Sequence, residues 1–271
     1  MGPLEYSHFS FDQMADDIKN HGCVNCFIIG RSGSGKTSVM KHIFCELADR
    51  GVVFDIVMAL VMLRTEQANL DCIVPPQHYI QVSGDYGKND KDLVTRSFKT
   101  FADQIGDSDN DVLVYEDKKR FFAVITDDLA ELNCNFKSSI IKSRHTNVSC
   151  IFVLHDLIHI SKVMRDSPYM YMFITSKLNT NNRSCANDYP GLDTIMNNKD
   201  LEQFMEKRGN IIVLAKSTSK DGSSTFSFDS RVERPPIVFK SHYHGKNMLI
   251  KKIKQFTEKE LNKLAEDTEH S

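Results

Sequence analysis

The sequence predicts an α/β domain with a mostly parallel sheet, and three observations lead to that prediction. Short apolar runs rich in β-branched residues alternate with segments whose apolar residues recur every three to four positions. The run at 24–29 stops at a glycine-rich turn, and a helical pattern follows from 37 to 50. Further apolar runs at 52–63, 121–126 and 149–154 are each separated by longer segments. Strands and helices that alternate in this way form a parallel sheet with helices on both faces.

The same two patterns predict each element along the chain. Gly51 is placed to terminate the first helix. In chain order we expect strands at 24–29, 52–63, 79–82, 121–126 and 149–154, helices at 37–50, 90–105 and 135–146, and a hairpin of 210–215 with 225–228. The C-terminal residues predict one amphipathic, basic helix. The expected organisation is an N-terminal segment (1–22), one large domain (23–240) with a small C-terminal hairpin, and a C-terminal helical appendage (241–271).

Composition limits the class of protein. With 271 residues and 41% apolar residues, the chain can bury a substantial core. The 34 basic and 36 acidic residues nearly balance, so no overall field indicates a nucleic-acid partner, although a local basic face can still supply one. We expect no signal peptide and no membrane span, because the longest apolar run is too short. The seven scattered cysteines predict reduced thiols, and the pair Cys23 and Cys26 is expected to pack in the core.

Residues 30–37 carry the most specific motif. They read Gly-Arg-Ser-Gly-Ser-Gly-Lys-Thr, which matches the P-loop pattern G-x-x-x-x-G-K-[ST] between a predicted strand and a predicted helix. The glycines let backbone amides point at phosphate oxygens, and the helix N-terminus adds a partial positive charge. Lys36 is predicted to reach the β- and γ-phosphates, and Thr37 to ligate magnesium. The motif therefore predicts ATP and Mg²⁺ as cofactors, with the nucleotide held by Gly30, Arg31, Ser32, Gly33, Ser34, Gly35, Lys36, Thr37 and Ser38.

The strand at 121–126 ends in two aspartates that predict a Walker B motif. Asp127 would hold the magnesium ion through water, and Asp128 would polarise the attacking water. The alternative is the run 112–117, which also ends in acidic residues but is shorter and follows an acidic loop. A strand and a helix lie between the P-loop and this motif. That insertion indicates the RecA-like, additional-strand class of P-loop proteins, where motors and remodelling ATPases are found.

Three segments together resemble the poxvirus-type genome-packaging ATPases, a viral branch of the FtsK/HerA motor superfamily. The first is 25–30 with the P-loop, and the second is 74–80, which is similar to a Trp-Pro-x-x-Ile turn of that family. The third, at 124–155, is the most discriminating. It contains the double aspartate, then Ser-Arg-His at 143–145, Asn-Val-Ser at 147–149, and a strand followed by a polar residue. The family has Gly where this chain has Ser143, and Gln where it has His155.

The resemblance covers about residues 23–215 and implies an activity. It implies an ATP-hydrolysing motor that assembles as a homo-oligomeric ring, a pentamer or hexamer, and moves double-stranded DNA into a viral capsid. A capsid or portal-vertex protein would be a further partner, and the location would be the virion or the host-cell cytoplasm, in the viral factory. The implied catalytic residues are Lys36, Asp128, Arg144 and His155.

Two of these residues keep alternative interpretations. His155 would stand at the sensor position and donate to the γ-phosphate or the catalytic water, or it would only cap the strand end. Arg144 would be a finger acting in trans, a cis contact to phosphate, or part of a structural ion pair. Two other functions also stay open, namely a nucleoside or nucleotide kinase and a regulatory P-loop ATPase switch that binds a protein partner.

Overall fold

The computed structural model describes residues 9–62, 70, 73–74, 78–82, 96–97, 114–115, 118–127, 129, 145–158, 169–178, 197, 199–206, 209–218 and 224–227. Asp128, Arg144 and the expected C-terminal helix lie outside the described residues, as does most of the expected helices at 90–105 and 135–146.

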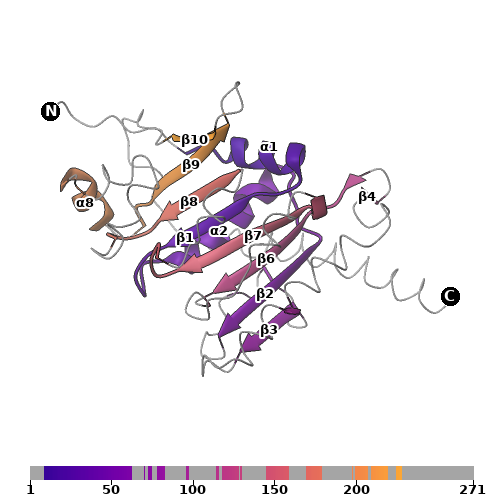
Figure 1. The fold of residues 1–271 in the computed structure, drawn as a ribbon, viewed down its shortest axis with the longest axis horizontal. Coiled ribbons are helices and arrows are strands. Elements are labelled where there is room, and N and C mark those ends of the chain that lie inside the picture. Colours follow the sequence, from indigo (N-terminus) through magenta and orange to yellow (C-terminus); the bar gives the residue numbers. More distant parts are fainter. Residues whose placement is uncertain are drawn as a thin grey trace.

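An eight-stranded sheet forms the centre of the molecule, in the order β10-β9-β8-β1-β7-β6-β2-β3 (Figure 1). Its strands are β1 (Asn25–Ile29), β2 (Ile56–Met62), β3 (Tyr79–Val82), β6 (Phe122–Asp127), β7 (Val148–Leu154), β8 (Met170–Ile174), β9 (Ile212–Thr218) and β10 (Ser224–Ser227). The strands from β8 to β3 pair in parallel, whereas β9 and β10 pair antiparallel at one edge. The mostly parallel sheet and its terminal hairpin are therefore confirmed.

The strand β7 lies between β1 and β6. Ile28 of β1 is in register with Val153 of β7, and Val153 is in register with Asp127 of β6. The strand that carries the P-loop and the strand that carries the predicted Walker B aspartate are therefore separated by one strand. This is the additional-strand, RecA-like arrangement predicted from the sequence.

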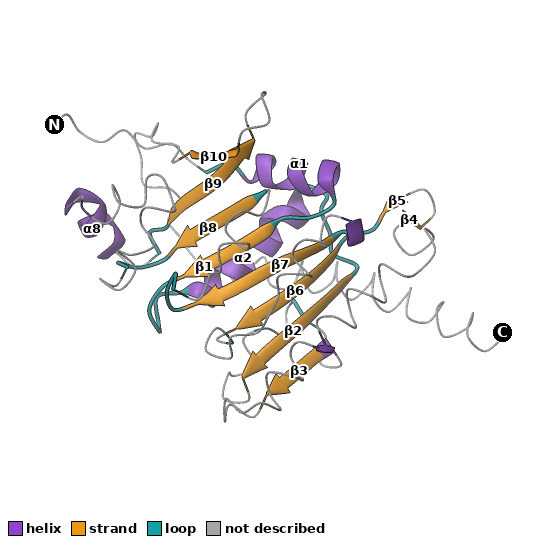
Figure 2. Ribbon diagram, in the orientation of Figure 1, coloured by secondary structure: helices purple, strands orange, loops and turns teal. Residues whose placement is uncertain are grey.

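Two helices pack side by side against one face of the sheet (Figure 2). Helix α1 spans Phe11–His21 and α2 spans Lys36–Asp49. Their apolar residues form one buried cluster with alternate residues of the central strands, such as Cys26 and Ile28 of β1. On the other face, the buried rings of Phe27 and Phe152 stack with centroids 5.1 Å apart. Strands buried on both faces explain why β1, β6 and β7 read as continuous apolar runs.

Helix α1 lies within the segment 1–22 that the sequence analysis set apart. Ser10 caps it by accepting from the amide of Asp12 at 3.1 Å, and Gly22 ends it with φ at 91°. Its buried residues Phe11, Met14, Ala15 and Ile18 follow helical spacing and belong to the main cluster. The helix therefore completes the core around α2, while the domain boundaries themselves stay a prediction.

The run at 52–63 forms a shorter strand than expected, because β2 begins only at Ile56. The preceding residue, Asp55, is buried and bonds to the start of the neighbouring strand. Its amide donates to Phe121 O at 2.8 Å, and its carboxylate accepts from the amide of Phe121 at 2.9 Å. Arg120 Nε lies 3.7 Å from the same carboxylate. The acidic residue inside the apolar run is thus buried with partners.

Two further differences concern the elements, whereas the thiols are as expected. The strand β8 and the helix α8 (Lys199–Glu206) were not predicted. β4 (Val114–Tyr115) and β5 (Lys118–Lys119) form a hairpin separate from the main sheet. Cys23 and Cys26 are buried free thiols, as expected, and burial raises the pKa of Cys26 far above its usual value. Within the described part of the chain, no helix is long and apolar enough to cross a membrane.

Candidate active site

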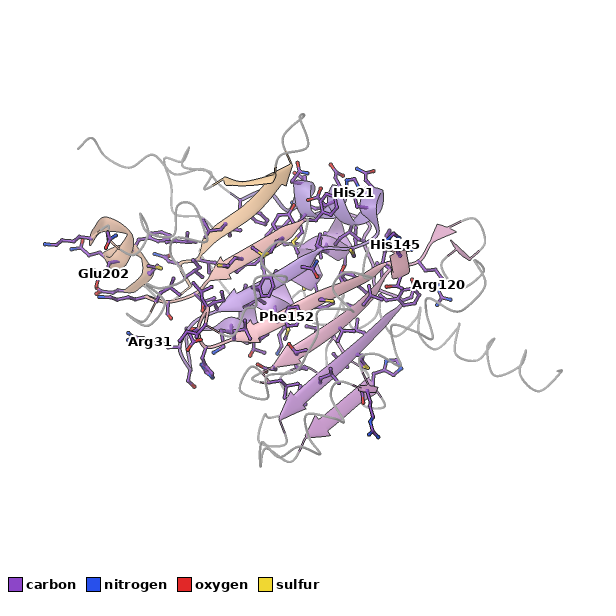
Figure 3. All side chains as sticks on the ribbon, viewed as in Figure 1. His21, Arg31, Arg120, His145, Phe152 and Glu202 are labelled. Carbon is purple, nitrogen blue, oxygen red and sulfur yellow. The ribbon has the colours of Figure 1, made fainter. Side chains whose placement is uncertain are left out.

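The P-loop lies at the side of the sheet formed by the C-terminal ends of the parallel strands. It connects β1 to α2, and it lies between the ends of β8 and β7 because these strands flank β1. Figure 3 shows Arg31 at the C-terminal ends of the strands, whereas Arg120 and His145 lie at the opposite ends. Ligands of open parallel sheets bind at the carboxyl ends of the strands, so the loop is at the expected place.

Three glycines of the loop are required for two different reasons. Gly33 and Gly35 have φ angles of 75° and 95°, and a Cβ added to either would meet nothing within 4 Å. Their backbone angles are the ones that favour glycine. A Cβ on Gly30 would instead lie 2.1 Å from Thr175 Oγ1 and 2.6 Å from Ser34 Oγ. Gly30 is therefore a glycine because the end of β8 leaves no room for a side chain.

The backbone amides of the loop divide into two groups. The amide of Gly30 donates to Leu154 O at 3.1 Å, that of Arg31 to Ser176 Oγ at 2.9 Å, and that of Ser34 to Arg31 O at 3.1 Å. These three amides hold the loop to β7, to β8 and to itself.

The second group belongs to the first turn of α2. Gly35 precedes the helix without a side-chain cap, and the first helical bond runs from Val39 N to Gly35 O at 3.0 Å. The amides of Lys36, Thr37 and Ser38 consequently have no acceptor within the helix. Together with the helix dipole they suit an anion such as a phosphate group.

Lys36 is 8% exposed, and its ammonium group contacts both the loop and the residue that follows β7. Nζ donates to Gly30 O at 2.8 Å and to Arg31 O at 3.3 Å, and it lies 3.3 Å from Nδ1 of His155. An ammonium group only donates, so this contact requires Nδ1 to accept. The structure thus brings together the P-loop lysine and the residue predicted to be the sensor, whose role stays a prediction.

The residues predicted to hold magnesium both lie at the side of the sheet where the parallel strands end. Asp127 is the last residue of β6 and is 6% exposed, and Thr37 lies in the first turn of α2. A hydroxyl and a carboxylate are the hard oxygen donors that Mg²⁺ prefers, and this ion commonly keeps several waters and phosphate oxygens. The donor set of the chain therefore fits the ion. Among the described residues, no group of three or more His, Cys, Asp and Glu side chains is arranged to hold a metal ion without such further ligands.

Of the alternative Walker B placement at 112–117, the structure describes Val114 and Tyr115. Val114 and Tyr115 pair only with Lys119 and Lys118, in the hairpin outside the main sheet. The acidic residues of that run, Glu116 and Asp117, lie outside the described residues, so this placement stays an open alternative. The predicted catalytic residues Asp128 and Arg144 lie outside the described residues.

The sequence analysis missed two residues that contact the P-loop, Thr175 and Ser176. Both follow β8, and the 4% exposed Thr175 bonds through its amide and hydroxyl to Ile29 O at the end of β1, and through its hydroxyl to Ser34 of the loop. The available signal was an apolar run at 170–174 followed directly by two hydroxyl residues.

Comparison with known proteins gives one family match. The family model described as "Poxvirus A32 protein" matches residues 8–232. No curated protein sequence matches the chain.

Solved structures give several distant similarities. The DNA-packaging ATPase B204 from Sulfolobus Turreted Icosahedral Virus is 12% identical with a TM-score of 0.46, and the match covers 75% of this chain and 96% of B204. B204 from Sulfolobus turreted icosahedral virus 2 in complex with ATP-gammaS is 12% identical with a TM-score of 0.42, covering 76% and 97%. ATPases 2 and 3 of EssC from Geobacillus thermodenitrificans are 13% identical with a TM-score of 0.49, covering 86% and 44%.

Proposed function

The chain belongs to the poxvirus A32 protein family, and from that premise we propose that it is an ATP-hydrolysing motor that moves double-stranded DNA into a viral capsid. It works as a homo-oligomeric ring, because a translocating motor must hold the duplex while individual sites turn over. The family match and the geometry of the P-loop support this proposal together. A capsid or portal-vertex protein would anchor the ring in the viral factory or the virion.

The single observation that carries the ATPase assignment is the arrangement around Lys36. The ammonium group, the amides of the first turn of α2 and the end of β6 all lie at one edge of the sheet. The amides and Lys36 bind the phosphates, and the metal that Thr37 and Asp127 would hold neutralises charge on them. Asp128 orients the attacking water, and His155 detects the γ-phosphate. Catalysis of this kind consists mainly of positioning and charge stabilisation.

The DNA contact follows from what packaging requires. The motor must hold whatever duplex passes through it, so it binds phosphates and does not read base edges. Binding should therefore depend little on sequence and should fall steeply as salt rises. The near balance of charges in the chain means that the contact comes from a local basic surface.

The test measures the ATPase rate with and without duplex DNA, together with the native mass of the assembly. We expect hydrolysis that DNA stimulates, in an assembly of several subunits. Lys36→Ala should lower the rate by on the order of 10²-fold or more, because it removes the charge that faces the phosphates. Lys41→Ala, in the same helix α2, is the matched control and should hydrolyse ATP normally.

The alternatives predict different results. ADP formation that depends on an added nucleoside would indicate a kinase, and hydrolysis that neither DNA nor assembly affects would indicate a regulatory switch. Normal hydrolysis by folded Lys36→Ala protein would contradict the ATPase assignment itself.

A further inference from the structure

The end of β8 forms a chain of hydrogen bonds with the P-loop. Thr175 Oγ1 donates to Ile29 O at 3.0 Å, and Thr175 N donates to the same carbonyl at 2.8 Å. Thr175 Oγ1 also lies 2.6 Å from Ser34 Oγ. A hydroxyl group has one proton, and that of Thr175 is used toward Ile29. Ser34 must therefore donate to Thr175.

The direction of these hydrogen bonds determines whether Ser34 can donate to a phosphate group. Its hydroxyl proton points at Thr175, and its backbone amide donates to Arg31 O at 3.1 Å. Both donors of Ser34 are therefore used within the protein. Ser34 holds the loop in shape, and phosphate contact falls to the other donors of the P-loop.

A second contact comes from the next residue. Ser176 Oγ accepts from the amide of Arg31 at 2.9 Å, so the loop is bonded to β8 on both sides of Gly30. Gly30 itself fits only because it lacks a side chain, since a Cβ there would lie 2.1 Å from Thr175 Oγ1. Four hydrogen bonds and one close approach thus join the two residues after β8 to Ile29 and the P-loop.

We propose that Thr175 is a positioning residue for nucleotide binding, which sets the shape of the P-loop through Ser34 and Ile29. This inference rests on the proposed ATPase function. Thr175 does not touch the nucleotide, and it acts by fixing the loop that presents Lys36 and the helix amides to the β-phosphate. ATP and ADP carry the same β-phosphate, so both should depend on Thr175 to a similar degree. Hydrolysis at saturating ATP should change less than affinity.

The test compares nucleotide affinity in variants that keep the shape of the side chain. Thr175→Val removes the hydroxyl group and keeps the branched volume. It removes the bond to Ile29 O and the bond from Ser34 Oγ, and it should weaken ATP and ADP binding by about 2- to 10-fold. Thr175→Ser keeps the hydroxyl group and should bind more tightly than Thr175→Val, close to the unmodified protein.

A double-mutant cycle tests whether Ser34 and Thr175 affect nucleotide binding through the same chain of hydrogen bonds. Ser34→Ala should weaken binding about as much as Thr175→Val, and the double variant should be no worse than either alone. Additive losses would mean that the two hydroxyl groups act independently, and would overturn the proposed chain.

The matched control removes a buried hydroxyl group at the N-terminal ends of the strands, away from the P-loop. Ser149 Oγ accepts from Val24 N at 3.1 Å, at the start of β7. Ser149→Ala should lower thermal stability and leave nucleotide affinity unchanged. If Thr175→Val behaves in the same way, Thr175 is only structural and the inference is wrong, although the ATPase proposal stands. If the unmodified protein binds no nucleotide, the proposed function fails and takes this inference with it.

Discussion

The ammonium group of Lys36 lies 3.3 Å from Nδ1 of His155, and this contact joins the start of α2 to the end of β7. The two residues are separated by 119 positions in the sequence. They meet because β7 lies beside β1 and both strands run in the same direction. A residue at the end of β7 therefore lies within reach of the group that a γ-phosphate would contact.

His155→Ala should reduce hydrolysis more than ATP binding, because the imidazole is expected to act on the γ-phosphate or the catalytic water. A loss of about 10²-fold in kcat is the scale for removing one such donor. His155→Gln should keep most of the activity, since an amide side chain both donates and accepts. Single-turnover rates and ATP affinity measure the two effects separately. His42→Ala in α2 serves as the control, and a normal rate for His155→Ala would reduce His155 to a strand cap.

Gly30→Ala should weaken nucleotide binding by more than tenfold. The added methyl carbon would lie 2.1 Å from Thr175 Oγ1, so the loop must shift away from β8. Gly51→Ala is the control, because Gly51 has φ at 78° with nothing within 4 Å of an added Cβ. That change should cost about 1 kcal/mol of stability through backbone strain and leave ATP affinity unchanged. Equal ATP affinities for the two variants would contradict the proposed packing of Gly30.

The two aspartates of the predicted Walker B motif should have different effects. Asp127→Asn should weaken binding that depends on magnesium, because it removes the negative charge at the end of β6 that would hold the ion through water. Asp128→Asn should bind ATP normally and fail to hydrolyse it, since the carboxylate that polarises water is lost. Affinity with and without magnesium, measured beside the hydrolysis rate, separates the two. Normal hydrolysis by Asp128→Asn with an inactive Glu116→Gln would move the motif to 112–117.

Arg144 should act across a subunit boundary. Its neighbour His145 lies at the opposite edge of the sheet from Arg31 (Figure 3), and the seven residues of β7 that follow span about 23 Å. A finger supplied in trans is worth on the order of 10³ to 10⁵ in rate. Arg144→Ala should therefore bind ATP but hydrolyse it slowly.

Mixed assemblies distinguish a trans role from the others. Arg144→Ala subunits and Asp128→Asn subunits should each be nearly inactive alone. When they assemble together, some interfaces combine an intact Asp128 with an intact Arg144 from the neighbour, and part of the activity should return. Proven co-assembly without recovery would assign Arg144 to its own site or to a structural ion pair.

Tyr171→Phe should destabilise the fold and change its response to alkaline pH. The buried hydroxyl group of Tyr171 donates to the carboxylate of Asp17, and so connects β8 to α1. Loss of a hydrogen bond to a charged group costs about 1.5–3 kcal/mol. Burial, followed by the bond to Asp17, raises the pKa of Tyr171 above its usual 10.0.

The sign of the pH effect follows from that raised pKa. The unfolded chain loses the phenolic proton near pH 10, whereas the folded chain keeps it. The contribution of Tyr171 is therefore complete below pH 10 and declines as the pH rises above it. Denaturant titrations between pH 8 and about 11 should show a shallower decline for Tyr171→Phe than for the unmodified protein. Parallel curves would mean that Tyr171 does not titrate with unfolding.

The sequence by itself determined the features that depend on local pattern. The residues 30–37 predicted a phosphate-binding loop because glycine spacing, a preceding apolar strand and a following helix are all read locally. The strands β1, β6 and β7 were predicted to within one or two residues, since strands buried on both faces are continuously apolar. Helix α1 was not predicted, although it has equally local signals in its Ser10 cap and apolar spacing.

Only the tertiary structure decided which distant residues surround the loop. The sequence shows no link between Gly30 and Thr175, because contact between them depends on β8 pairing beside β1. The order of strands in a sheet is set by which apolar faces and edges pair most favourably, and that is a property of the whole chain. The same strand order places His155 against Lys36. His145 lies at the other end of β7, the strand that leads to His155.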